Sequence, residues 1–132
     1  MIEIKRVVRE PGYRTKMAVI SQDPKIDCIG ACVGVRGSRI KAVIDELRGE
    51  RIDIIRWSDE PSEFVTDALK PALIRSITLD EETKVIHVTV DEEDLSKAIG
   101  RRGQNARFTS KLVNWDVQVR KDESQHEQFE AR

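Results

Sequence analysis

Two short basic loops, residues 34–37 and 100–103, hold the side chains of this chain that are best suited to chemistry. Both have the pattern Gly-x-x-Gly, and the second begins 66 residues after the first (34 to 100). The glycines allow positive φ and a close approach to the main chain. A helix is predicted to begin directly after each loop, at Ser38 and Gln104, so its unpaired N–H groups and the positive end of its dipole face any ligand over the loop. Together with the loop arginines, this arrangement predicts an anion site that suits a chain of phosphates.

The sequence around both loops repeats as well. Apolar residues recur at helical spacing before and after each loop, and an alternating strand follows. The second helical stretch of each copy is predicted to stop at Gly49 or Asn114, residue types that tolerate the left-handed conformation at a helix end. The chain therefore consists of two copies of one unit, with the order β-β-α-α-β in the first and α-β-β-α-α-β in the second.

Local signals predict where several elements begin. Residues 10–13 have proline at the second and glycine at the third position of a type II turn. Asp23 is predicted to cap the helix before the first loop, with Pro24 at its first position. Residues 91–94 are predicted to cap the helix before the second loop. Residues 61–72 are predicted to form the leading helix of the second unit. Since no such helix precedes the first unit, we expect a fragment of a longer protein and a partly uncovered first sheet.

The charge of the chain is balanced overall but unevenly distributed. Lys and Arg number 23 against 24 Asp and Glu, for a net charge of -1. Residues 28–44 and 95–112, which contain the two loops, have no acidic residue. Basic residues often only decorate solvated helix faces, but here they coincide with two repeated loops. This distribution favours local phosphate binding over indiscriminate adhesion to polyanions.

Several segments resemble a known family. These segments are residues 9–16, 34–40, 49–54, 68–72 and 98–105. They are similar to the paired KH region of the NusA family of bacterial transcription elongation and termination/antitermination factors, in which Gly-x-x-Gly joins two helices. The resemblance implies an α+β fold of two consecutive type II (prokaryotic) KH domains, each a three-stranded sheet packed with helices. We place the first KH domain at 1–58, the second at 59–121 and a polar tail, expected to be disordered, at 122–132.

The resemblance also implies a function. It predicts binding of single-stranded RNA, the nascent transcript, as part of a transcription factor that modulates pausing, termination and antitermination. Within the family RNA polymerase is bound through regions that this chain lacks, and no DNA partner is expected. An alternative remains open, namely a KH-like protein-interaction module of the transcription or ribosome-assembly machinery without strong RNA affinity. Salt-dependent binding to single-stranded RNA distinguishes the two.

The residues predicted to bind RNA form one group in each unit. In the first unit they are Gly34, Val35, Arg36, Gly37, Ser38, Arg39 and Ile40. In the second unit they are Gly100, Arg101, Arg102, Gly103, Gln104, Asn105, Arg107 and Lys111. The loop residues should hold the sugar-phosphate backbone, and the last two, which share a helix face, could extend the phosphate track. Ile40 is either a core residue or part of an apolar floor beneath the bases.

Other kinds of chemistry find little support. No nucleophile lies beside a base in a recognisable motif, and the loops lack the Lys-Ser/Thr ending of a P-loop, so no enzyme is predicted. Cys28 and Cys32 are one helical turn apart, but structural zinc needs four ligands, so we predict no metal and no cofactor and expect reduced, packed cysteines. No apolar run of about 18 residues is present, which predicts a cytoplasmic protein without a membrane contact.

Overall fold

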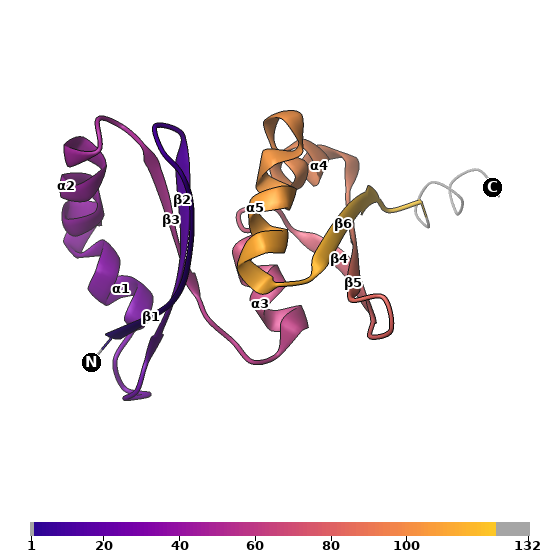
Figure 1. The fold of residues 1–132 in the computed structure, drawn as a ribbon, viewed down its shortest axis with the longest axis horizontal. Coiled ribbons are helices and arrows are strands. Elements are labelled where there is room, and N and C mark those ends of the chain that lie inside the picture. The colour runs from indigo at the N-terminus through magenta and orange to yellow at the C-terminus, as the bar shows by residue number, and fades with distance from the viewer. Residues whose placement is uncertain (1, 124–132) are drawn as a thin grey trace. The chain divides into compact units, whose positions relative to one another are not determined.

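The computed structural model describes residues 2–123, and its contacts divide the chain into two compact units between Asp67 and Ala68 (Figure 1). Each unit contains a three-stranded sheet and a pair of helices joined by a short loop. This is the predicted α+β arrangement of two consecutive KH domains.

In the first unit, a helix–loop–helix segment connects two parallel strands. The elements are β1 (Ile2–Glu10), β2 (Arg14–Ser21), α1 (Cys28–Val33), the 3₁₀ turn η1 (Val35–Gly37), α2 (Ser38–Glu46) and β3 (Arg51–Arg56). The sheet order is β1-β2-β3, with β1 antiparallel and β3 parallel to β2. Parallel neighbours need a long crossover, and here the crossover carries the Gly-x-x-Gly loop.

The second unit repeats this topology. Helix α3 (Pro61–Ala68), which lies in the first compact unit up to Asp67, precedes it in the chain. The elements of the second unit are β4 (Ile74–Asp80), β5 (Val85–Val90), α4 (Glu92–Ile99), the 3₁₀ turn η2 (Arg101–Gly103), α5 (Gln104–Val113) and β6 (Asp116–Lys121). The sheet order is β4-β5-β6, again with one antiparallel and one parallel pair. Helix α3 ends before the predicted residue 72, because Pro71 disfavours a helical conformation in the residue before it.

Within the first compact unit, helix α3 is bonded to the chain at the end of β3. The Asp67 carboxylate accepts a hydrogen bond from the Arg56 amide at 2.8 Å. The Phe64 ring meets the Trp57 ring edge-on, with centroids 6.3 Å apart. By these contacts α3, up to Asp67, belongs to the first compact unit.

The predicted hairpin turn at residues 10–13 is present and is held by a buried glutamate. The amide of its last residue donates to the carbonyl oxygen of its first at 3.0 Å, and Gly12 has φ +80°. Glu50, 2% exposed, accepts hydrogen bonds from Arg9 Nη2 at 2.9 Å, Thr15 Oγ1 at 2.6 Å and the Gly12 amide at 2.9 Å. These bonds, first of all that from Arg9, lower the pKa of Glu50 to about 2.

The start of α1 differs from the prediction. The helix begins at Cys28, and the capping residue is Asp27, whose Oδ1 accepts from the Ile29 amide at 3.2 Å. The predicted cap, Asp23, instead accepts from the Lys25 amide at 3.0 Å. Its side chain thus closes a local turn in the loop before the helix.

Arg75 accounts for a second difference in capping. Asp91 stands at the N-cap of α4 but makes no side-chain cap bond, because its carboxylate lies 3.3 Å from Arg75 Nε. Arg75 Nε also lies 3.4 Å from the Asp122 carboxylate, and the Asp122 amide donates to Val90 O at 2.8 Å. Ordered pairing therefore reaches residue 122, while residues 124–132 of the predicted tail lie outside the described residues.

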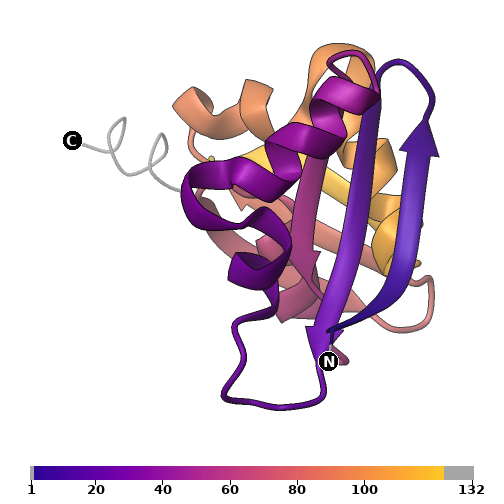
Figure 2. The same cartoon turned by 90° about the vertical axis from the view of Figure 1, so that its left-hand side faces the viewer.

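Burial follows the alternation of the strands. On β5, Ile86, Val88 and Val90 are fully buried, and the residues between them are half-buried. In the first unit, α1 and α2 cross in front of the sheet and leave the indigo edge strand β1 uncovered (Figure 2). Ile4 and Val7 on β1 are accordingly 56% and 50% exposed. The exposed apolar side chains Ile4 and Val7 thus lie on the edge strand of the first sheet.

Candidate nucleic-acid interface

The two glycines of each loop have different surroundings. Gly34 and Gly100 have φ of +81° and +77°, and a Cβ atom on Gly100 would lie 2.7 Å from Asn105 Cβ. Gly37 and Gly103 have φ of +73° and +72°, but a Cβ on Gly103 would meet no atom within 4 Å. The first glycine therefore lets the loop pack on the next helix, and the second presents bare main chain to open space.

Each loop also holds one arginine in the left-handed region. Arg36 has φ 53° and Arg102 has φ 57°. This conformation costs a residue with a Cβ atom roughly 1–2 kcal/mol. Because both copies keep this unfavourable conformation, we attribute it to the shape that the loop must present.

The loop side chains point into solvent. Arg36, Arg101 and Arg102 are exposed, and within residues 2–123 none of them forms an ion pair. Val35, beside Arg36, is 81% exposed, as predicted for a residue with no place in the core. Their positive charge is therefore available to an anionic ligand.

The helices behind the loops begin where the sequence predicts. Helix α2 starts at Ser38 and α5 at Gln104, and in both the preceding glycine provides no side-chain cap. The first amide of each helix donates back into the loop, Ser38 N–H to Val35 O and Gln104 N–H to Arg101 O. The other amides of the first turn of an α-helix have no partner within the helix, and the dipole adds positive potential there. Backbone donors and arginine side chains thus converge at each loop, an arrangement that suits phosphate oxygens.

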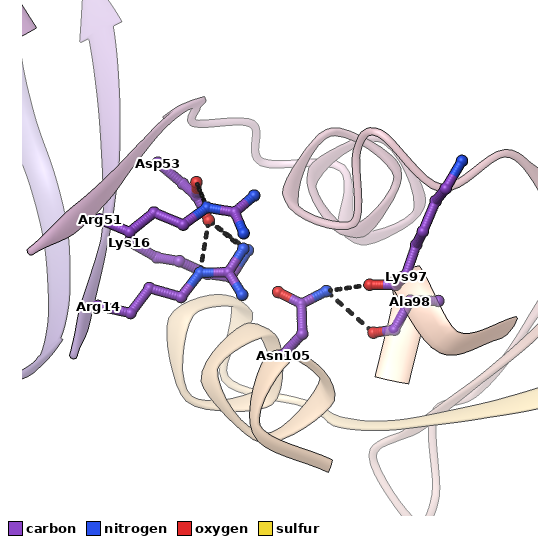
Figure 3. A network of polar contacts seen from close by, with 7 residues as sticks. All are labelled: Arg14, Lys16, Arg51, Asp53, Lys97, Ala98 and Asn105. Carbon is purple, nitrogen blue, oxygen red and sulfur yellow. Dashed lines mark hydrogen bonds and ion pairs between the residues drawn. The ribbon is translucent and has the colours of Figure 1, made fainter. Parts of the chain in front are cut away.

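Two of the predicted RNA-binding residues have side chains that donate hydrogen bonds to the preceding helix. Asn105 is 2% exposed, and its Nδ2 donates to Lys97 O at 3.2 Å and Ala98 O at 2.9 Å (Figure 3). Arg39 Nη1 donates to Ala31 O at 2.6 Å. The Asn105 side chain is therefore buried against the end of α4. Sequence reasoning missed these bonds because each joins residues on two different helices.

The remaining predicted positions lie along the helices after the loops. Arg107 and Lys111 are exposed on α5, and Arg107 Nη1 donates to Arg102 O at 3.2 Å. Ile40 on α2 is half-buried, which fits either a core residue or part of an apolar floor beneath the bases.

A charged cluster on the first sheet was not predicted. The Asp53 carboxylate pairs with Arg14 Nη2 at 2.5 Å and with Lys16 Nζ at 3.3 Å, and Arg51 Nε lies 3.4 Å away (Figure 3). Burial lowers the pKa of Lys16 to about 8, an effect that Asp53 opposes. Burial would raise the pKa of Asp53, but its cationic neighbours, first of all Lys16, bring it below its usual range. The available signal was the placing of charges at alternate positions on β2 and β3.

Other candidate features are absent from the part of the chain that the structure describes. Residues 2–123 contain no group of three His, Cys, Asp or Glu side chains that could hold a metal ion. Cys28 is buried and Cys32 half-buried, both as free thiols. Among the described helices, none has the length and apolar character needed to cross a membrane.

The sequence matches two family models in tandem. Residues 1–57 match the NusA-like first KH domain, and residues 61–127 match the NusA-like second KH domain.

Relatives named transcription termination/antitermination protein NusA match nearly the whole chain. The protein of Halalkalibacterium halodurans is 44% identical over 96% of this chain, and that of Bacillus subtilis is 45% identical over 92%. The protein of Rickettsia prowazekii is 44% identical over 95%. The chain spans only 33%, 33% and 25% of the lengths of these three relatives.

One solved structure is similar to this chain in fold. The crystal structure of APE1850 aligns with a TM-score of 0.65 at 25% identity, over 90% of this chain and 88% of that one.

Proposed function

This chain belongs to the family of NusA-like KH domains, and on that basis we propose that its two Gly-x-x-Gly loops bind the backbone of single-stranded RNA. Each loop would hold about four nucleotides. The backbone amides at the starts of α2 and α5 would meet phosphate oxygens, and the loop arginines would neutralise their charge.

One observation supports this proposal above the others. The same turn occurs twice, with an open second glycine and an exposed arginine in the left-handed region, Arg36 in one copy and Arg102 in the other. A packing role does not require bare main chain beside an unpaired guanidinium. A ligand with a row of anionic oxygens requires both, because it binds to backbone N–H groups and to guanidinium groups.

The wider role follows from the relatives. We propose that this region acts within a transcription factor that modulates pausing, termination and antitermination, with the nascent transcript as its RNA. RNA polymerase would be bound through other regions of such a factor, and the site of action would be the cytoplasm. No enzymatic activity and no cofactor are part of the proposal.

Charge reversal at the loops tests the RNA site. The two variants are Val35→Asp with Arg36→Asp, and Arg101→Asp with Arg102→Asp. If each arginine neutralises one phosphate, it contributes about 0.7 to the slope of log affinity against log salt. Loss of two contacts should then weaken binding about 25-fold at about 0.1 M salt, and loss of one about fivefold. Charge reversal at the second loop should therefore weaken RNA binding more than charge reversal at the first.

The assay is fluorescence anisotropy of a labelled, unstructured RNA of about ten nucleotides, titrated between about 50 and 200 mM KCl. A matched control reverses two charges away from the loops, with Lys25→Asp and Arg120→Asp. Equal losses in the control and the loop variants would show an effect of overall charge only. Folded protein that binds no RNA at low salt would contradict the proposal and favour a protein-interaction module.

A further inference from the structure

Each loop is tied to the helix before it by the side chain five residues after its first glycine. In the first unit this residue is Arg39, whose Nη1 lies 2.6 Å from Ala31 O. In the second it is Asn105, whose Nδ2 lies 3.2 Å from Lys97 O. The acceptors are also 66 residues apart (31 to 97). Two different side chains thus make the same bond in both copies.

A second tie is found in the second loop alone. Arg107 Nη1 donates to Arg102 O at 3.2 Å. The matching position in the first unit is Lys41 (41 to 107 is again 66). Lys41 is exposed and makes no hydrogen bond or ion pair within residues 2–123.

The bond from Arg107 acts on the peptide plane that matters for the loop. A peptide group is planar, so the Arg102 carbonyl and the Gly103 N–H move together. The Gly103 amide closes the turn by donating to Gly100 O at 3.1 Å. Holding the Arg102 carbonyl therefore stabilises both the turn and the left-handed conformation of Arg102.

We infer that Arg107 is a positioning residue for the second loop, and that this brace makes the second loop the more pre-organised RNA anchor of the two. This inference rests on the proposed function and replaces the predicted role of Arg107 as a phosphate contact. A loop already in its binding shape loses less conformational entropy when the ligand arrives. The first loop has only the Arg39 tie and must order more of its main chain on binding.

Charge-conserving exchanges test the brace. Arg107→Lys keeps the positive charge but removes the planar guanidinium that reaches the carbonyl. In RNA-free protein, NMR should show solvent exchange of the Gly103 amide rising about threefold, the effect of one modest hydrogen bond. RNA affinity should fall about threefold, with an unchanged salt slope. Lys41→Arg should do the reverse in the first loop by slowing exchange of the Gly37 amide and tightening binding.

Lys25→Arg, an equivalent exchange in the loop before α1, is the control and should change neither amide. The inference is overturned if Arg107→Lys leaves Gly103 exchange as it is. It is also overturned if Arg107→Ala lowers the salt slope by about 0.7, because that marks a direct phosphate contact. Exchange is measured without RNA, so altered exchange in a protein that binds no RNA would refute the proposed function and the anchoring role but leave the brace in place.

Discussion

Alanine at Gly100 and at Gly103 should separate the two tasks of the loop glycines. Gly100 has φ 77° and ψ 172°, a region open almost only to glycine, which costs other residues about 1–3 kcal/mol. A Cβ there would also lie 2.7 Å from Asn105 Cβ and 2.8 Å from its backbone nitrogen. Neither atom is the end of a flexible side chain, so relieving this clash needs a backbone shift that costs about 1–3 kcal/mol. The expected loss of stability for Gly100→Ala is therefore about 2–6 kcal/mol.

Gly103→Ala should cost far less. Its φ of +72° and ψ of 12° lie in the ordinary left-handed region, where alanine costs about 1–2 kcal/mol, and no atom lies within 4 Å of the new methyl group. The methyl group instead occupies the open side of the loop. We therefore expect a folded Gly103→Ala variant with weakened RNA binding.

Urea unfolding followed through Trp115 fluorescence, in a Trp57→Phe background, reports on the second unit alone. The variant with alanine at Gly100 should lose at least about 1 kcal/mol more than the variant at Gly103. Equal losses would refute the argument that close packing on the next helix requires the first glycine. Gly34→Ala and Gly37→Ala offer the same comparison in the first unit.

Three further outcomes are expected. Glu50→Gln should remove a pH-dependent part of the stability. The pKa of Glu50 is about 2 in the folded state against 4.5 ordinarily, so its contribution is complete above about pH 4.5 and is lost as the pH falls toward 2. Acid titration of folding by circular dichroism will show this loss. Lys16 makes stability depend on pH in the alkaline range. Its pKa is lowered to about 8 in the folded state, so the unfolded chain binds the proton more tightly and stability should rise between about pH 8 and 10.5. Lys16→Met should flatten that rise in urea titrations. Arg102→Gly should keep or raise the thermal midpoint, because glycine tolerates φ 57°, while RNA affinity falls; Arg101→Gly, at a position without positive φ, is the control and should lower the midpoint.

The loops could be predicted from the sequence because their determinants are local. Glycine spacing, the helices on either side and the absence of acidic residues all lie within a short stretch of chain. The same holds for the start of α5 at Gln104 and for Asn114, which ends that helix with φ 63° as predicted. The repeat gave each observation an internal check, because an accidental pattern would not recur 66 residues later with the same order of elements.

The errors came from competition between equally good local signals. Asp23 and Asp27 are both suitable caps, and each accepts a hydrogen bond from an amide two residues ahead. Only at Asp27 does a helix follow, and its first residue, Cys28, is buried against the sheet, with Sγ 3.9 Å from Val19 O. At Asp91 the competitor was Arg75, distant in sequence, which the capping pattern does not include.

The roles of Arg39 and Asn105 were hidden for a related reason. Polar residues beside a basic loop predict ligand contacts. Their side chains also donate to carbonyl groups eight residues earlier (39 to 31, and 105 to 97). Such bonds depend on how two helices cross, which sequence periodicity does not reveal.

The parallel pairing of β2 with β3, and of β5 with β6, sets the order in which each unit is completed during synthesis. The antiparallel hairpins join residues near in sequence and close early, whereas the parallel partners must wait for the whole helix–loop–helix segment to emerge from the ribosome. The Gly-x-x-Gly loop lies inside that segment, and the bonds that tie it to its helices also lie there. A nascent chain paused before β3 or β6 would therefore carry a finished hairpin and a complete helix–loop–helix segment that still lacks the parallel strand of its sheet.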